Sequence, residues 1–165
     1  MTAATNPASA PENLLGEALR LRGQTISTAE SCTGGLVLHR LTNVPGSSAW
    51  VMGGVVAYDN SVKQGLLKVR ETTLLKHGAV SEETAREMAL GARRLLGTDL
   101  AISITGIAGP GGGTAEKPVG LTWMALAMPD GRLLSERHLH DGDRLEVKRA
   151  SADAALAMVL GYLKN

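Results

Sequence analysis

The 165-residue chain contains no phenylalanine, and its two tryptophans and two tyrosines bring the aromatic share to only 2%. Proteins that bind single-stranded nucleic acid stack the bases on aromatic rings, so this scarcity disfavours such a function. Basic residues exceed acidic residues by 17 to 16, or +1, which is too balanced for the positive face that a phosphate backbone requires. We therefore expect no nucleic-acid partner, and a core built from aliphatic side chains and methionine.

Cysteine is almost absent, and long apolar runs are missing. The one cysteine, Cys32, cannot form an internal disulfide, which fits a reducing compartment. No run approaches the roughly 18–20 apolar residues of a membrane span, and residues 1–11 lack the charged and apolar regions of a signal peptide. We expect a cytoplasmic protein with no membrane partner, consisting of a disordered lead over residues 1–11 and one domain over residues 12–165.

Glycine is the abundant residue, with 20 of 165 positions, or about 12% against a usual share of roughly 7%. The excess is clustered, because five glycines fall within residues 106–113. Clustered glycine indicates that the backbone turns sharply or approaches another group closely.

Helix and strand patterns alternate along the first two thirds of the chain, and a hairpin pattern follows. We expect strands over residues 24–29, 50–58, 99–105, 119–128 and 132–140, the last two joined through Pro129-Asp130-Gly131. We expect helices from Pro11 to Gly23, over residues 36–41, from a cap at Asp59 or Asn60 to about Val69, between Ser81 and Gly97, and from a cap at Asp141 or Asp143 through Leu145 to Leu163. This order predicts a three-layer α/β/α sandwich with a mixed sheet.

The first candidate site is the turn that follows the first expected strand. Ser31 and Thr33 stand there, directly before the pair Gly34-Gly35. A hydroxyl residue between a strand and a helix is a well-presented nucleophile, because N–H groups of the turn and of the helix N-terminus can stabilise an oxyanion. The alternative is structural, with both hydroxyls as helix caps and the glycines as turn residues.

The second candidate site consists of Tyr58 and Lys63, after the second expected strand. If Asn60 is the cap, Lys63 takes the third helical position, where the helix dipole disfavours a cation. Lowering a lysine pKa from about 10.4 to about 7 takes roughly 4–5 kcal/mol, and the dipole supplies at most about 2, so desolvation or another cation must add the rest. A neutral lysine can take a proton from a serine, with Tyr58 as its partner. The alternative is a surface lysine beside a strand-end aromatic.

The third candidate site is the glycine-rich segment from Ser103 to Gly113, which continues through residues 114–118. Successive glycines expose N–H groups that can bind an anion such as a phosphate. The segment is not a Walker A loop, and its glycine spacing does not fit the dinucleotide-binding fingerprint. The alternative is a purely structural loop, although five glycines are costly to order for a mere connection.

Other polar residues give weaker signals. The four histidines show no metal-ligand spacing, so we expect no metal site. Cys32 is either a second candidate nucleophile or a half-buried structural thiol. Arg144 and Arg149 either cover a solvated helix face or bind a phosphate, and the residues alone leave both interpretations open.

Several motifs resemble, in order and spacing, the CinA C-terminal domain family. They are Ala29–Gly35, Gly46–Ser48, Gly54-x-x-x-Tyr58-x-Asn60-x-x-Lys63, His77–Ser81, Gly106–Thr114 and Lys117–Gly120. The resemblance runs from about residue 12 to the C-terminus. Stand-alone members of that family are nicotinamide-nucleotide amidohydrolases of the PncC type, which convert nicotinamide mononucleotide to nicotinate mononucleotide and ammonia in pyridine nucleotide salvage. Longer members also carry a molybdopterin-binding-like domain, whose activities we do not expect here.

The resemblance implies a role for each candidate residue. Ser31 would be the nucleophile that forms an acyl-enzyme, Lys63 the general base and Tyr58 its partner. Thr33, Gly34 and Gly35 would frame the oxyanion site. The nucleotide substrate would contact Thr105, Gly106, Ala108, Gly109, Gly111 and Gly112, with Arg144 and Arg149 as hypothetical phosphate ligands. The family also implies the α/β/α fold, no metal, no cofactor and a homo-oligomer, with a dimer favoured.

Two other functions are compatible with the residues. A catalytically silent sensor of nucleotide phosphates, linked to competence or DNA damage, would use only the glycine-rich loop. Such a binder has no reason to keep Ser31, Tyr58 and Lys63 in register. A general Ser/Lys amidase would instead prefer nicotinamide or small peptides to the nucleotide.

Overall fold

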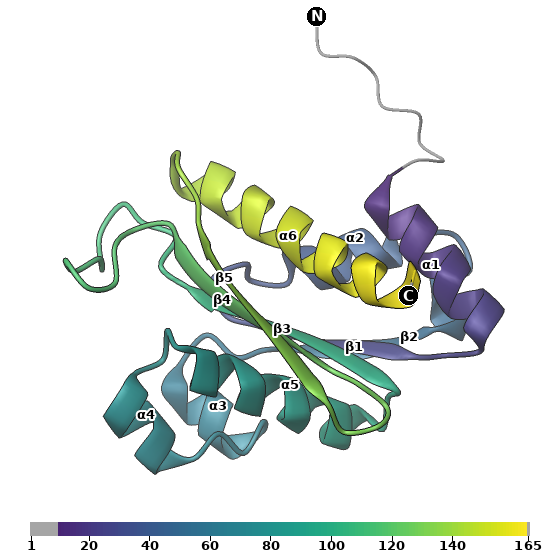
Figure 1. Ribbon diagram of the computed structural model, residues 1–165, viewed down its shortest axis with the longest axis horizontal. Helices are drawn as coiled ribbons and strands as arrows, with labels where there is room; N and C mark the ends of the chain where they lie inside the picture. Colours follow the sequence, from purple (N-terminus) through teal and green to yellow (C-terminus); the bar gives the residue numbers. More distant parts are fainter. Residues whose placement is uncertain (1–9, 165) are drawn as a thin grey trace, which may run out of the picture.

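The computed structural model describes residues 10–164, which form a five-stranded sheet with helices on both faces (Figure 1). Most of the lead expected over residues 1–11 lies outside the described residues. The strands are β1 (Ile26–Glu30), β2 (Val51–Val56), β3 (Leu100–Gly106), β4 (Leu121–Ala127) and β5 (Leu133–Leu139). The helices are α1 (Pro11–Arg22), α2 (Leu36–Thr42), α3 (Asn60–Gly65), α4 (Glu71–His77), α5 (Glu82–Leu96) and α6 (Arg144–Lys164), with a short 3-10 helix, η2 (Ser47–Ala49).

The sheet is mixed, as the sequence predicts. Its strand order is β2-β1-β3-β4-β5, so the apolar strand β3 lies in the centre. Strands β1, β2 and β3 run parallel, whereas β4 and β5 form an antiparallel hairpin at one edge. Because the three parallel strands end at the same edge, the segments that follow β1, β2 and β3 meet there, which is where ligands bind in open α/β sheets.

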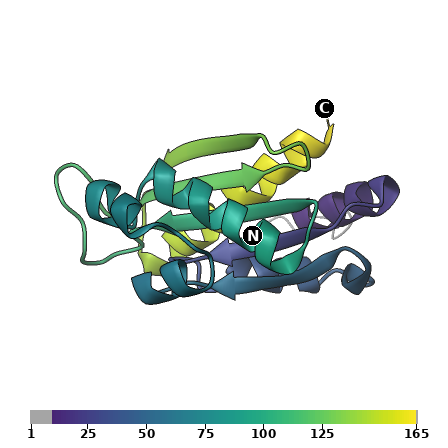
Figure 2. The ribbon, with the colours of Figure 1, turned by 90° about the horizontal axis from the view of Figure 1, so that it is seen from below.

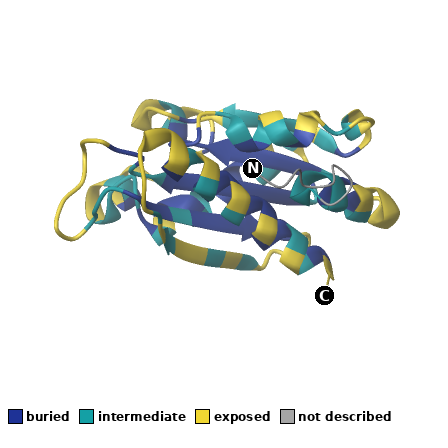
Figure 3. Ribbon diagram, turned by 90° about the horizontal axis from the view of Figure 1, so that it is seen from above, coloured by how far each residue is buried: buried dark blue, intermediate teal, exposed yellow. Residues whose placement is uncertain are grey.

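Each face of the sheet has its own core. Helices α1, α2 and α6 cover one face, and α3, α4 and α5 cover the other (Figures 1 and 2). Leucine, isoleucine, valine and methionine fill the first core, together with Trp50, whereas alanines dominate the second. The central strands are almost wholly buried, while the helices expose their outer sides (Figure 3). The scarcity of aromatic residues is therefore met by close packing of aliphatic side chains.

The glycine pair in β2 marks both a bulge and a close approach. The register between β1 and β2 shifts after the pair Ile26–Val51, so that Ser27 faces Gly53. A Cβ at Gly54 would lie only 2.2 Å from the Thr28 hydroxyl oxygen. Glycine at position 54 therefore lets β1 and β2 pair closely, directly before the segments that carry the candidate site.

Three details differ from the sequence-based expectations. The helix expected to reach Val69 ends at Gly65, because the chain then turns and Lys68 takes a left-handed conformation with φ of 59°. Helix α4 was not predicted, since it buries only Thr73 and so has no apolar stripe. Leu145 is 56% exposed rather than part of the apolar side of α6.

The structure also decides between the alternative helix caps. Asp59 accepts from the Ser61 amide, and Asp143 accepts from the amides at positions 145 and 146.

No helix within residues 10–164 is long and apolar enough to cross a membrane.

Candidate active site

The segments after β1, β2 and β3 surround a pocket of about 280 Å³, which we call the Ser31 pocket. Its volume is close to the lower end, about 300 Å³, of typical small-molecule sites. Ten residues that the sequence singled out as site residues line it: Ser31, Tyr58, Lys63, Thr105, Gly106, Ala108, Gly109, Gly111, Gly112 and Arg144. The three candidate segments thus form one site, although Ser31 and Gly112 lie 81 residues apart in the chain.

Ser31 and Lys63 are in direct contact in the pocket. The Lys63 Nζ lies 3.2 Å from the Ser31 Oγ, and it donates to the carbonyl oxygens of Ala57 at 2.8 Å and Tyr58 at 3.2 Å. A neutral amine has two N–H donors and one lone pair. With both donors on the two carbonyls, the lone pair of neutral Lys63 faces the Ser31 hydroxyl. This geometry is that of a nucleophile beside its base.

Lys63 is the largest fully buried side chain, with 1% of its surface exposed. Burial lowers the pKa of Lys63 below its ordinary value, while the Asp59 carboxylate opposes the shift. The helix dipole does not cause this shift, although the sequence suggested that it would. With Asp59 rather than Asn60 as the cap, Lys63 is the fourth residue of α3 and lies in the last turn of this six-residue helix, where the dipole does not disfavour a cation. Desolvation therefore favours the neutral amine.

Tyr58 contributes to the pair through its backbone. Its carbonyl accepts from Lys63, whereas its side chain is 61% exposed and bonds to Arg144. The phenolic oxygen pairs with Arg144 Nη2 at 2.8 Å, and Arg144 Nη1 donates to the Gly109 carbonyl at 2.7 Å. Arg144, at the start of α6, thus connects the segment after β2 with the glycine-rich loop, and its guanidinium stands at the pocket.

The turn after β1 is organised by a residue to which the sequence gave no role, Glu30. Its buried carboxylate accepts from the Thr33 hydroxyl at 2.6 Å and from the Gly35 amide at 3.0 Å. The amides of Val37 at 3.1 Å and Leu38 at 2.8 Å complete its four bonds. Glu30 therefore caps helix α2, whose N-terminus attracts negative charge.

The three residues expected to frame the oxyanion site differ from those lining the pocket. Thr33 and Gly35 are bound to the Glu30 carboxylate, and the Gly34 amide donates to the Ser31 carbonyl at 3.1 Å. None of these three residues lines the Ser31 pocket. The hydroxyl and amides that the sequence assigned to an oxyanion are thus engaged within the turn.

The glycine-rich loop supplies the opposite side of the pocket. Gly106 ends β3 at a crowded position, where a Cβ would lie 2.7 Å from the Leu121 carbonyl oxygen and 3.1 Å from the Cys32 Sγ. The loop then passes through a cis peptide bond between Gly109 and Pro110. Only glycine lets the backbone pass this close to the nucleophile turn.

The basic residues of α6 are placed differently from the expectation. Arg149 does not line the pocket, and its side chain is exposed. Lys148 lies one residue earlier and turns toward the nucleophile segment, with Nζ 3.6 Å from the position that a Cβ of Gly34 would take. Arg144 and Lys148 are four residues apart and therefore share one face of the helix.

Sequence reasoning also missed Asn60, Ala79 and Val80, which line the pocket. The motif spanning residues 77–81 was recognised, but Ala79 and Val80 have no reactive or charged side chain. The sequence therefore gave no sign that they line the pocket. Cys32 also lines the pocket, and burial raises the pKa of its thiol to about 11. The thiol is therefore protonated at neutral pH, as the structural alternative predicts.

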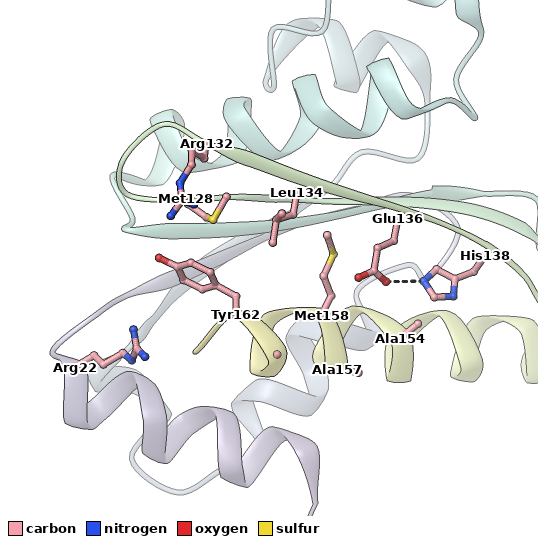
Figure 4. Close-up of a pocket in the computed structure, with 11 residues that line it drawn as sticks. Arg22, Met128, Arg132, Leu134, Glu136, His138, Ala154, Ala157, Met158 and Tyr162 are labelled. Atoms are coloured by element: carbon pink, nitrogen blue, oxygen red, sulfur yellow. Dashed lines mark hydrogen bonds and ion pairs between the residues drawn. The ribbon is translucent and has the colours of Figure 1, made fainter. Parts of the chain in front are cut away.

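A larger cavity, of about 710 Å³, lies elsewhere, between β5 and α6 (Figure 4). None of the residues predicted for the site lines it. Its lining includes Leu134 and Met158 in the middle, Arg22, Arg132 and Tyr162 toward one end, and Glu136 and His138 toward the other. Size alone does not locate the chemistry, because of these two cavities only the smaller one is lined by a serine hydroxyl in contact with a lysine amine. No cluster of three potential metal ligands occurs in the described part of the chain.

Comparison with known proteins gives consistent matches. The family model described as the CinA C-terminal domain matches residues 8–163. A nicotinamide-nucleotide amidohydrolase PncC of Enterobacter agglomerans is 47% identical over 152 residues, which cover 92% of this chain and 93% of that protein. The crystal structure of a competence damage-inducible protein A of Klebsiella pneumoniae has a TM-score of 0.92 and 35% identity, and the match covers 97% and 99% of the two chains.

Longer relatives also match. A CinA-like protein of Chloroherpeton thalassium is 52% identical over 151 residues, which cover 90% of this chain. The matched region spans 36% of that relative, about a third of its length.

Proposed function

Because the chain belongs to the CinA C-terminal domain family, we propose that it hydrolyses the carboxamide of nicotinamide mononucleotide, giving nicotinate mononucleotide and ammonia. The observation that carries this proposal is the buried Lys63 amine 3.2 Å from the Ser31 hydroxyl, in a pocket lined by glycines and an arginine. The product places the reaction in pyridine nucleotide salvage, and we propose that it takes place in the cytoplasm.

The first half of the reaction acylates Ser31. Neutral Lys63 takes the hydroxyl proton as the Ser31 oxygen attacks the carboxamide carbon, which forms a tetrahedral intermediate with an oxyanion. Lys63, now an ammonium, returns this proton to the leaving nitrogen. The C–N bond breaks, ammonia departs, and the nicotinoyl group remains as an ester on Ser31.

The second half restores the enzyme. A water molecule gives a proton to Lys63 and attacks the ester carbon, and the Ser31 oxygen leaves with the proton that Lys63 returns. The sum is one amide and one water converted to one carboxylic acid and one ammonia. The carbonyls of Ala57 and Tyr58 hold the Lys63 amine in place through both halves.

The oxyanion needs hydrogen-bond donors near Ser31. Since the amides of Gly34 and Gly35 are engaged and Thr33 does not line the pocket, we assign this role to the amide of Cys32, which directly follows the nucleophile and lines the pocket. The Glu30 carboxylate supports it indirectly, because it fixes the turn through the Thr33 hydroxyl.

The nucleotide phosphate requires cations or free amides. Arg144 lines the pocket, and Lys148 projects from the same side of α6. We therefore propose these two residues, rather than Arg149, as the cations that attract the phosphate. The amides of the glycine-rich loop, at Gly109, Gly111 and Gly112, form the facing side.

The test is ammonia release from nicotinamide mononucleotide in metal-free buffer, with the product identified by chromatography. We expect turnover by the wild type and none above background by Ser31→Ala. Binding of the nucleotide without ammonia release would instead support a phosphate sensor, and faster turnover of nicotinamide or small peptides would support a general amidase.

We also propose that the protein forms a homodimer through the groove between β5 and α6 (Figure 4). Strand β5 is at the sheet edge, and its exposed Leu134 faces the groove between Arg132 and Glu136. If two copies of β5 pair antiparallel about Leu134, each Arg132 lies opposite Glu136 of the second copy. Such self-complementarity is what a twofold interface requires.

Oxidation of Leu134→Cys tests this interface, because the two copies of residue 134 would meet at the axis. We expect a covalent dimer, and none from Leu139→Cys, whose exposed side chain does not line the groove. The native Cys32 is buried and does not interfere. A monomer in sedimentation at micromolar concentration, with no crosslink, would contradict the proposal.

A further inference from the structure

One wall of the Ser31 pocket is the segment that links α4 to α5. Ala79 and Val80 of this segment line the pocket. The segment is fixed at its start by Lys117, whose Nζ donates to the His77 carbonyl at 2.6 Å. An ammonium is favourable at this position, because the carbonyls at the C-terminus of α4 carry partial negative charge.

The next two carbonyls of the segment are also bound by side chains. The Gly78 carbonyl accepts from the hydroxyls of Ser81 at 3.0 Å and Thr84 at 2.8 Å, both near the start of α5. The Ala79 carbonyl accepts from the Thr105 hydroxyl, at the end of β3, at 2.7 Å. Three successive carbonyls thus accept hydrogen bonds from side chains in three different parts of the chain.

Lys117 differs from the other three side chains because it comes from residues 114–118, where the glycine-rich segment ends. It closes a turn at the end of that loop: the Thr114 amide donates to the Lys117 carbonyl at 2.8 Å, and the Lys117 amide donates to the Thr114 hydroxyl at 3.0 Å. The same loop supplies the glycines on the facing side of the pocket. The Lys117–His77 bond therefore joins two walls of the pocket that are otherwise separate in the chain.

Lys117 has no place in the chemistry proposed above, since it does not line the Ser31 pocket. We propose that Lys117 is a positioning residue for nucleotide binding: it holds the glycine-rich loop against the segment 77–80, so that both walls face the nucleotide at a fixed spacing. The proposal rests on the proposed function. Ser31 directly follows β1 and Lys63 lies in α3, whereas the hydrogen bonds of Lys117 described above go to His77 and Thr114, so we expect the acyl-transfer step itself not to depend on it.

The test compares Lys117→Met with Lys117→Arg and with a matched control, Lys76→Met. Lys76 is an exposed lysine beside His77, so its replacement removes the same charge but no bond to the wall. For Lys117→Met we expect a KM for nicotinamide mononucleotide about tenfold higher, the equivalent of one charge-assisted hydrogen bond, with kcat changed less than about twofold. Arginine keeps a donor and is expected to restore most of the affinity, and the control to match the wild type.

A KM of Lys117→Met equal to that of the wild type would overturn the proposal, and so would a loss confined to kcat. If that variant does not fold, hydrogen exchange of the wild type decides. Added nucleotide is then expected to protect the amides of 78–80 and of 109–113 together, and protection of only one group would overturn the proposal.

The two proposals fail separately. A wild type that binds the nucleotide but releases no ammonia refutes the amidohydrolase and leaves the positioning role testable through the Kd of the same variants.

Discussion

Two buried ionisable side chains lie near the ends of neighbouring strands: Glu30 is the last residue of β1, and Lys63 lies in α3, the helix that follows β2. Glu30 accepts four hydrogen bonds, all from the turn and helix that directly follow it. Lys63 has three contacts, and one of them is the Ser31 hydroxyl at the pocket. All four hydrogen bonds of the Glu30 carboxylate thus come from its own segment. The Lys63 amine, in contrast, has one contact with the Ser31 hydroxyl at the pocket.

The difference teaches that burial alone does not identify a catalytic group. A buried carboxylate with four donors is a structural cap, because the hydrogen bonds compensate its lost hydration. A buried amine whose pKa is lowered and which lies beside a hydroxyl is suited to proton transfer. Changes at the two positions should therefore affect different properties.

The largest expected effect is on catalysis. Lys63→Met should lower kcat/KM for ammonia release by about 1,000-fold, because Ser31 loses its base. Glu30→Gln should lower it less than tenfold as long as the variant remains folded. Steady-state assays of both variants at the pH optimum check this contrast. Comparable losses would mean that Glu30 also participates in the chemistry.

The second effect is on stability and belongs to Glu30. Glu30→Gln replaces an acceptor with a donor against buried amides, and should lower the free energy of unfolding by about 2–3 kcal/mol. Urea denaturation measures the loss, and Glu71→Gln, on the exposed first turn of α4, serves as the control. A change in Glu30→Gln as small as in the control would refute the capping role.

The third effect is the pH dependence of stability. Because the pKa of Lys63 is lower in the folded than in the unfolded protein, the unfolded chain binds more protons between these two values. The stability of the wild type relative to Lys63→Met should therefore rise with pH across that window, up to the ordinary lysine pKa of about 10.4, by at most about 1.4 kcal/mol per pH unit. Urea midpoints from pH 7 to 10.5 give the slope, and a flat difference would contradict a lowered pKa.

The smallest effect concerns the charge that opposes the shift. Asp59→Asn keeps the helix cap, since asparagine caps as well as aspartate, but removes the carboxylate that raises the pKa of Lys63. The acid limb of the kcat/KM profile should move to lower pH. A limb that moves to higher pH would show that Asp59 does not act on the base through its charge.

The layer order, the mixed sheet and the convergence of the three segments could be predicted from sequence, because apolar periodicity and turn residues are local signals. Ser31, Lys63 and the glycine-rich loop were found in this way as candidates with structural alternatives, and the family resemblance favoured the functional interpretation. Their roles stay predictions, whereas their proximity is a result of the parallel strands ending at one edge.

Other features could not be predicted because they depend on tertiary contacts. The hydrogen bonds of Glu30 form only when the turn folds back on it, and helix α4 has too few apolar residues to show a period. Which of Lys148 and Arg149 faces the Ser31 segment depends on how α6 is rotated against the sheet. The spacing of the residues in the sequence does not give this rotation.

The central claim is that Lys63 is a neutral base for Ser31, and the most direct test is to titrate its side chain by NMR with 13C-labelled lysine. The chain has only six lysines, so Lys63→Met assigns the signal. We expect one lysine to titrate below the ordinary pKa of about 10.4, at the same pH as the acid limb of kcat/KM. A Lys63 that titrates at the ordinary value, or away from that limb, would contradict the mechanism.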